Sequence, residues 1–246
     1  MLKSTVKQVL QKLLGFDNYL FVFSIFTIRK MRRNHHEEEF AHFMELIPDK
    51  GAILDIGANI GIMTVTLAEK FRNAQVFSFE PMPQNLKALK RIISYFKLKN
   101  VTVFEMALGE ENGELTMVMP VLDKVKMQGL SHVVEGDDND PMNKGLTFKV
   151  PVKRLDEIKE LMELPAIHAI KIDVENFEYP VLKGARALLV KHKPVIYCEL
   201  WKNERRDLTL DYLRGLGYQV KAYDGKQMVD FTNQEVTNFI LVPAGS

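Results

Sequence analysis

Cysteine, net charge and long apolar runs are all scarce in this chain of 246 residues. The single cysteine, Cys198, lies within an apolar run, so neither an internal disulfide nor a multi-cysteine metal site can form. Lysine and arginine total 33 against 32 for aspartate and glutamate, and the net charge of +1 provides no field that would attract a polyanion. We therefore expect a reducing, cytoplasmic setting and no nucleic-acid partner.

The longest apolar stretch, residues 19–28, is about half as long as a membrane-spanning helix needs to be. A basic cluster at residues 29–33 follows this stretch, which is the reverse of the order in a secretory signal. The cluster could contact an anionic membrane surface, but the acidic residues 37–39 behind it favour a solvated helix. Peripheral membrane contact is therefore the less favoured of the two interpretations.

The hydrophobic pattern divides the chain into two parts. Residues 6–14 and 40–47 carry apolar stripes at helical spacing, which predict an N-terminal helical cap over residues 1–50. From there on, short β-rich runs alternate with amphipathic helices, which is typical of βαβ units around a mainly parallel sheet. One α/β domain is thus predicted over residues 51–246.

Seven strands are predicted for the main sheet, with a helix over residues 179–190 after the fourth. One segment, residues 114–150, is weakly patterned: two strand-like runs, 115–118 and 146–150, flank the polar residues 135–140. We expect this segment to be an insertion or a lid. The seven strands are residues 52–56, 75–79, 101–104, 169–173, 194–200, 218–223 and 238–242.

A glycine-containing turn follows the first predicted strand. Gly57 and Gly61 allow the backbone to approach a ligand at the carboxyl end of that strand. Glu80 closes the next strand about 20 residues later, where a carboxylate can accept hydrogen bonds from both hydroxyls of a ribose. This spacing indicates an adenosine-containing cofactor.

The charges around the turn distinguish one such cofactor from another. A nicotinamide dinucleotide requires a third glycine beside its pyrophosphate, and that glycine is absent. Asp55, inside the strand, would be poorly placed beside a pyrophosphate but could attract the cationic methionyl half of S-adenosylmethionine, directly or through water. Taken singly, Asp55 could be hydrogen-bonded to the turn and Glu80 could be a solvated strand end. Their joint spacing favours a sulfonium cofactor.

Five motifs, in their order and spacing, resemble those of the FkbM-type methyltransferases over roughly residues 50–202. The resemblance implies a class I, Rossmann-like α/β fold whose seven-stranded, mainly parallel sheet ends in an antiparallel strand. It also implies that S-adenosylmethionine binds over the carboxyl ends of the strands and donates a methyl group to a hydroxyl of a sugar, glycan or polyketide-like small molecule. The motifs are residues 55–61, 79–81, 107–109, 171–175 and 181–185.

The candidate cofactor-binding residues come from the first three of these motifs. Asn176 departs from the family pattern, which usually has glycine after the Asp-Val-Glu run. Asparagine is one of the few other residues that enter the left-handed backbone region, so we expect the turn to be kept. The cofactor-binding candidates are Asp55, Gly57, Ala58, Asn59, Gly61, Glu80, Pro81 and Ala107.

Methyl transfer to a hydroxyl requires a group that orients the hydroxyl and accepts its proton. Asp173, at the end of the strand beside the cofactor strand, is the first candidate for this catalytic role, and Glu175 and Glu199 are the second. Glu175 could equally stabilise a helix N-terminus, and the three carboxylates could alternatively bind a divalent cation, although we predict no metal site. For the acceptor, Trp201 could stack on a sugar ring and His132 could reach in from the lid.

Two other classes of protein remain open. A nicotinamide-dependent sugar oxidoreductase would share the sheet and the ribose-binding Glu80 but would need the missing glycine. A non-catalytic nucleoside-binding module would keep the fold without the chemistry, and Asn176 is the residue that suggests it.

Overall fold

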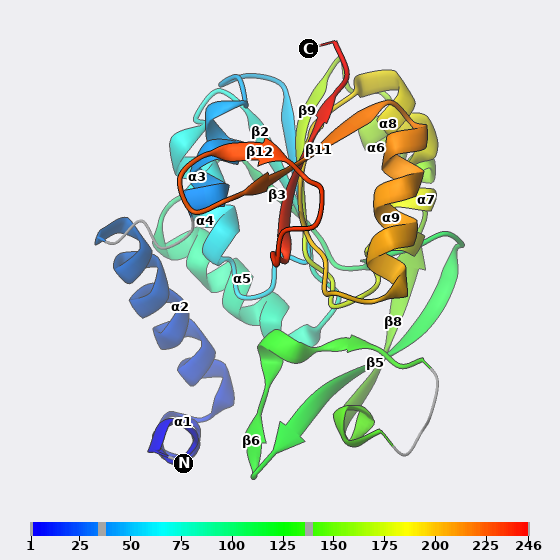
Figure 1. Ribbon diagram of the computed structural model, residues 1–246. Helices are drawn as coiled ribbons and strands as arrows, with labels where there is room; N and C mark the ends of the chain where they lie inside the picture. Colours follow the sequence, from blue (N-terminus) through cyan, green and yellow to red (C-terminus); the bar gives the residue numbers. More distant parts are fainter. Residues whose placement is uncertain (1, 34–37, 136–139, 246) are drawn as a thin grey trace.

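The structure is a computed structural model that describes residues 2–33, 38–135 and 140–245, and it contains two β-sheets (Figure 1). Within these residues the larger sheet has eight strands in the order β12-β11-β13-β10-β9-β1-β2-β3. The neighbouring strands from β3 to β10 are parallel, whereas β13 runs antiparallel to both of its neighbours. The strands are β1 (Ala52–Ile56), β2 (Gln75–Phe79), β3 (Val101–Phe104), β9 (Ile167–Ile172), β10 (Val195–Glu199), β11 (Tyr218–Tyr223), β12 (Met228–Asp230) and β13 (Asn238–Pro243).

The predicted α/β architecture is confirmed, with one strand more than expected in the main sheet. The seven predicted strands correspond to β1, β2, β3, β9, β10, β11 and β13, and the last strand is antiparallel, as the resemblance implied. The additional strand, β12, has three residues and pairs with β11 at the edge of the sheet. So short a strand shows no clear alternation of apolar and polar residues, and the sequence pattern therefore does not reveal it.

Helices cover both faces of the main sheet (Figure 1). All five residues of β1 are buried, as expected for a parallel strand enclosed by two helical layers. Separate apolar clusters fill the space between the sheet and each layer. One layer contains α3 (Glu38–Glu45), α4 (Ile62–Lys70) and α5 (Pro83–Tyr95), and the other contains α6 (Lys159–Met162), α7 (Glu178–Lys183), α8 (Arg186–His192) and α9 (Glu204–Gly215).

The N-terminal segment forms three helices with different surroundings. Helix α3 packs into the core of the main sheet: the ring centroids of Phe40 and Phe43 lie 5.2 and 5.5 Å from that of Tyr197 on β10. Helix α2 (Phe16–Arg33) packs on α4 and α5, where Ser24 Oγ donates a hydrogen bond to the main-chain oxygen of Ile60. Helix α1 (Leu2–Leu14) is bent by 119° from α2 and lies beside the second sheet.

The second sheet is built from residues that follow β3 and lies across the carboxyl ends of the parallel strands (Figure 1). The predicted runs 115–118 and 146–150 fall within β5 and β8, which pair antiparallel with Leu115 opposite Val150. Of the polar residues 135–140, residues 136–139 lie outside the described residues. The elements are β4 (Ala107–Leu108), β5 (Gly113–Leu122), β6 (Val125–Lys126), η1 (Gln128–Leu130), β7 (His132–Val133), η2 (Pro141–Asn143), β8 (Gly145–Lys153) and the following η3 (Leu155–Glu157).

The single helix predicted over residues 179–190 is wrong, because the chain forms two helices, α7 and α8, in this region. The carboxylate of Asp156 accepts hydrogen bonds from the amides of Ala187 and Leu188 and so caps the start of α8. Gly184, at the break, packs so closely on the loop after β4 that a Cβ would lie 2.0 Å from the main-chain oxygen of Gly109. Both constraints come from distant segments and leave no periodic signal in the sequence.

Candidate functional site

The turn between β1 and α4 is fixed by close backbone contacts. Gly57 has φ 75°, and a Cβ on it would lie 1.9 Å from the main-chain oxygen of Asp173, so only glycine fits. The amides of Gly57 and Ala58 both donate to the main-chain oxygen of Phe79, at 3.0 and 2.9 Å. Gly61, with φ 87°, precedes the first residue of α4. The turn thereby places the amide of residue 59 against the end of β2.

Glu80 is buried at that end of β2 and is held through both of its carboxylate oxygens. Oε2 accepts a hydrogen bond from the Asn59 amide (2.8 Å), and Oε1 accepts from the Met82 amide (2.9 Å) and from Asn85 Nδ2 (3.3 Å). Burial raises the pKa of Glu80 to about 7, although these hydrogen bonds favour the charged form and oppose the shift. The carboxylate is therefore fixed in position before any ligand binds.

A cavity opens at the carboxyl ends of β1, β2 and β9, with the second sheet on its far side. Five of the predicted cofactor-binding residues line it, whereas Ala58 and Gly61 lie behind the lining and only shape the turn. The second sheet contributes Met117, Gln128 and Val133. The five lining residues are Gly57, Asn59, Glu80, Pro81 and Ala107.

Three buried oxygen atoms around this cavity have no hydrogen-bond partner among the described residues. They are Oδ1 of Asn59, Oδ1 of Asn85 and Oε1 of Gln128, and all three residues line the cavity. A buried acceptor without a partner costs about 1–3 kcal/mol, so a ligand that supplies N–H or O–H donors would be stabilised here. The amino and hydroxyl groups of an adenosine-containing cofactor are donors of this kind. The donor and acceptor set of the cavity therefore fits such a cofactor.

Asp55 does not line the cavity, so the structure does not bring its carboxylate into the direct contact with a ligand that the sequence had suggested. Its carboxylate is fully buried, and Oδ2 accepts a hydrogen bond from Thr64 Oγ1 on α4 at 2.5 Å. Oδ1 lies 3.6 Å from the Nζ of Lys171 on β9. The side chain points into the layer between the sheet and α4 rather than beyond the strand end. Asp55 supports the site from beneath.

Lys171 is a central residue that the sequence interpretation missed. Its buried ammonium donates to the main-chain oxygen of Gly57 (3.0 Å) and lies 3.6 Å from Asp55 and 3.8 Å from Asp173. Burial alone would lower the pKa of Lys171, but the neighbouring carboxylates outweigh burial and raise it above its ordinary value. The available signal was a lysine between two isoleucines of a buried strand, where a charge needs a partner.

Asp173 and Glu175 bring two carboxyl groups to the cavity beyond β9. Burial, together with the charges of Asp173, Glu199 and Glu178, raises the pKa of Glu175 to about 8. Glu178, at the start of α7, is buried as well and accepts a hydrogen bond from the Val174 amide at 3.0 Å. Burial raises its pKa to about 7 despite that hydrogen bond. Glu178 therefore holds the loop that carries the other two groups.

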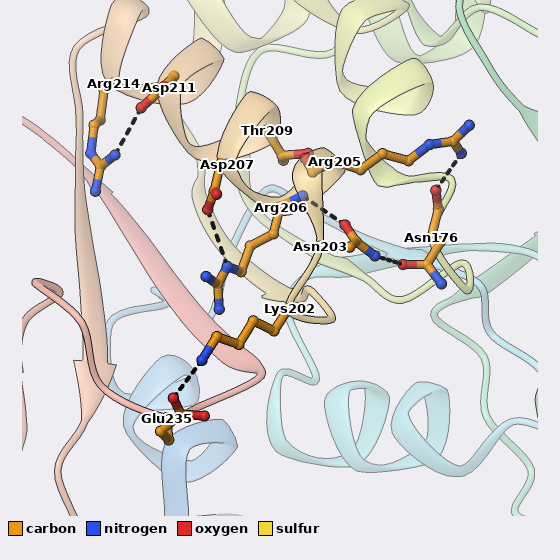
Figure 2. A network of polar contacts seen from close by, with 10 residues as sticks. All are labelled: Asn176, Lys202, Asn203, Arg205, Arg206, Asp207, Thr209, Asp211, Arg214 and Glu235. Carbon is orange, nitrogen blue, oxygen red and sulfur yellow. Dashed lines mark hydrogen bonds and ion pairs between the residues drawn. The ribbon is translucent and has the colours of Figure 1, made fainter.

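Asn176 keeps the turn that the family usually makes with glycine. Its φ is 70° and that of Glu175 is 53°, so both residues occupy the left-handed region. Figure 2 shows how the turn is tied to α9: Asn203 Nδ2 donates to Asn176 Oδ1 at 2.7 Å, and Arg205 Nη1 donates to the main-chain oxygen of Asn176 at 2.8 Å. Asn203 also caps α9 by accepting from the Arg206 amide.

A second hollow, lined mainly by polar and charged residues, adjoins the cavity at Glu175. His132 lines it, with Nε2 3.1 Å from Oδ1 of Asn143 and Nδ1 2.9 Å from the main-chain oxygen of Leu130. Arg205 reaches this hollow from α9 and forms an ion pair of 2.6 Å with Glu135, which follows β7 in the chain. His132 and Arg205 thus line the same hollow as Glu175 and Asn176.

The predicted catalytic residue Glu199 and the predicted acceptor-binding residue Trp201 lie outside the lining of both hollows. Glu199 ends β10, and its charge contributes to raising the pKa of Glu175. Trp201 is 47% exposed. The amide of Leu200 donates to the main-chain oxygen of Thr237, immediately before β13. In the described part of the chain, no group of three or more His, Cys, Asp or Glu residues is arranged to hold a metal ion.

The sheet order, the antiparallel last strand and a carboxylate after β2 above the strand ends together define a class I methyltransferase fold. The model of the methyltransferase FkbM domain matches residues 55–220. The chain belongs to the FkbM methyltransferase family.

Curated relatives and solved structures agree with this assignment. The chain is 29% identical over 147 residues to Methyltransferase 1 of Beauveria bassiana, covering 56% of this chain and 59% of the relative. It is 25% identical over 159 residues to Methyltransferase sdnD of Sordaria araneosa, covering 56% and 61%. The chain thus spans about three fifths of the length of these relatives. A crystal structure of methyltransferase FkbM from Methylobacillus flagellatus matches in fold, with TM-score 0.53 and 20% identity, over 79% of this chain and 44% of that one.

Replacing Lys171 should show how strongly the buried charges of Lys171 and Asp55 stabilise each other in the folded chain. We expect Lys171→Met to lower the free energy of unfolding by about 3–5 kcal/mol, because it leaves Asp55 buried without its cation. Adding Asp55→Asn should recover part of the loss, since the amide removes the unpaired charge. Urea unfolding of the four proteins in this cycle measures the coupling. Additive effects would show that the two residues do not stabilise each other.

The pH dependence of stability should change when Glu178 is made neutral. Because burial raises its pKa from 4.5 to about 7, the folded chain binds more protons than the unfolded chain between these values. The stability contributed by the protonated form is therefore present below 4.5 and lost as the pH rises through about 7. Glu178→Gln keeps an acceptor for the Val174 amide, so it should match the wild type at low pH and exceed it by about 1–3 kcal/mol near pH 8.

Chemical denaturation across this pH range provides the measurement, and Glu160→Gln on the exposed side of α6 is the matched control. The control should leave the pH profile unchanged. A Glu178→Gln profile parallel to that of the wild type would contradict the assignment of the slope to Glu178.

Proposed function

We propose that this chain transfers a methyl group from S-adenosylmethionine to a hydroxyl group of a polar small molecule or carbohydrate. One observation carries the proposal: a single cavity is lined by the fixed carboxylate of Glu80, by three oxygens without partners among the described residues, and by the carboxyl groups of Asp173 and Glu175. Membership of the FkbM family supports methyl transfer as the reaction.

The cofactor half of the cavity is suited to an adenosine-containing ligand. The Glu80 carboxylate would accept hydrogen bonds from the ribose hydroxyls, and the free oxygens of Asn59, Asn85 and Gln128 would accept from other N–H or O–H groups. S-adenosylmethionine would supply an electrophilic methyl group on a sulfonium centre. Since the residues around Glu80 already hold it in place, binding requires little rearrangement there.

The acceptor half offers one group that accepts a proton and one that donates a hydrogen bond. Asp173 lies partly exposed in the cavity, and its carboxylate would accept the proton of the attacking hydroxyl. Glu175, whose pKa is about 8, is largely protonated at neutral pH and would donate a hydrogen bond to a second acceptor oxygen. A carbohydrate or other polyol has two neighbouring oxygens that suit such a pair, and the polar hollow beyond Glu175 has room for the remainder.

The two competing classes of protein gain no support from the site. The non-catalytic binding module was suggested by Asn176, which keeps the left-handed turn and its link to α9. The nicotinamide oxidoreductase requires a glycine that the turn lacks.

Removing the Glu80 carboxylate should weaken cofactor binding. We expect Glu80→Ala to raise the Kd for S-adenosylhomocysteine by at least about tenfold, because hydrogen bonds to a charged group contribute about 1.5–3 kcal/mol each. Isothermal titration calorimetry measures the change, and Glu105→Ala, at an exposed glutamate after β3, is the matched control. Equal affinity of all three proteins, or no binding by the wild type, would contradict the proposal.

Asp173→Asn should separate catalysis from cofactor binding. The amide keeps the shape of the side chain but cannot accept the hydroxyl proton, so we expect kcat to fall by about 10²–10⁴ while the Kd for S-adenosylhomocysteine stays unchanged. Radiolabelled methyl transfer to a panel of sugar and polyketide hydroxyls identifies the acceptor and then measures the rate. Full activity of the Asp173→Asn variant would show that Asp173 does not take part in the reaction.

A further inference from the structure

Helix α1 turns its polar side toward the protein and its apolar side outward. Gln11 pairs with the backbone of Lys126 on β6 twice: Nε2 donates to the Lys126 oxygen at 3.0 Å, and Oε1 accepts from the Lys126 amide at 3.1 Å. Lys7, on the same side, lies 3.7 Å from the sulfur of Met127. The helices of soluble proteins normally bury the opposite face. The arrangement leaves the apolar stripe of α1 largely exposed among the described residues.

The stripe continues onto α2 and forms what we name the N-terminal apolar surface. Leu13 is 76% exposed and Phe26 is 64% exposed, values that are unusual for side chains of this size. An apolar groove runs between the two helices, with Leu10 on one wall and Val22 on the other. The surface consists of Val6, Val9, Leu10, Leu13, Leu14, Val22 and Phe26.

Positive charge is concentrated in the same two helices. Residues 1–33 contain seven lysines and arginines and one aspartate, a net charge of +6, so the rest of the chain carries −5 of the total of +1. On α2 the exposed residues Phe26, Arg29 and Arg33 follow one another at helical spacing and therefore share a face. On α1 the exposed Lys12 borders the apolar stripe. An apolar strip flanked by cations is the pattern of a helix that lies in an anionic membrane interface.

We infer that the N-terminal apolar surface docks on an anionic lipid bilayer, with both helices lying in the plane of the interface. No single helix in the described ranges is long and apolar enough to cross a bilayer, and α1 and α2 pass such a test only as a pair bent by 119°. Leu20, Ser24 and Ile28 hold α2 against the domain, so the pair cannot straighten without unpacking. The helices therefore lie on the membrane.

Charge favours a lipid surface over a second copy of the chain. A twofold interface through this surface would bring the same basic residues of both copies together, and like charges would oppose the contact. An anionic bilayer supplies both the apolar depth that Leu13 and Phe26 require and the opposite charge. This inference stands on α1 and α2 and does not depend on the proposed methyl transfer.

Vesicle co-sedimentation of the full chain tests the inference. We expect the protein to bind vesicles of phosphatidylcholine mixed with phosphatidylserine, to bind pure phosphatidylcholine much less, and to dissociate as salt screens the charges. Leu13→Glu should lower the partition coefficient by about tenfold or more, because it removes a leucine that would insert into the bilayer and adds a negative charge. The substitution leaves packing intact, since Leu13 is exposed.

The matched control is Leu208→Glu, which makes the same change at a leucine of α9 that is 52% exposed. It should bind vesicles like the wild type. The inference is overturned if the wild type does not bind the anionic vesicles, if it binds both lipid mixtures equally, or if both variants bind alike. It is also overturned if light scattering shows a dimer that Leu13→Glu dissociates while lipid binding is absent, because the surface would then join two copies.

Discussion

The ammonium of Lys171, buried beneath the cavity, is the interaction on which the site depends. It donates to the main-chain oxygen of Gly57 and lies beside the carboxylates of Asp173 and Asp55. An ion buried this deeply costs several kcal/mol to desolvate and is stable only when opposite charges and acceptors surround it. One cation therefore sets the spacing between the turn that would hold the cofactor and the loop that would hold the acceptor. The close contact of Gly57 with the Asp173 backbone fixes the same spacing sterically.

Most of the main sheet could be predicted because its strands and helices have strong periodicity. The parts that could not be predicted depend on contacts between distant segments. Strand β12 forms by pairing with β11 at the edge of the sheet. The break between α7 and α8 depends on Asp156, which lies 31 residues before Ala187 in the sequence. The second sheet shows the same limit: its two long strands were visible in the pattern, but their pairing and their position across the strand ends were not.

The residues of the candidate site also differ in whether the sequence alone could locate them. Glu80 could be located from the sequence because the carboxyl ends of parallel strands meet at one edge, so a residue that ends a strand is placed by topology alone. Asp55 lies inside a strand, and the direction of its side chain depends on what packs on that face, here Thr64. Trp201 follows β10, but its side chain is exposed outside the lining of both hollows, and no pattern in the sequence indicates that direction. The role of Lys171 was missed because it depends on the three acceptors that surround its ammonium in the folded chain.

The pairing of Gln11 with β6 has a mechanical consequence. Because both of these hydrogen bonds are to main-chain atoms of Lys126, they do not depend on which side chain occupies that position. Two residues later the chain enters η1, where Gln128 lines the cavity. Helix α1 is thus joined to the second sheet through these two hydrogen bonds and to α2 through Gly15, whose φ is 72°. The helix that carries the outermost apolar side chains is therefore linked to a wall of the cavity by two hydrogen bonds and two residues of chain.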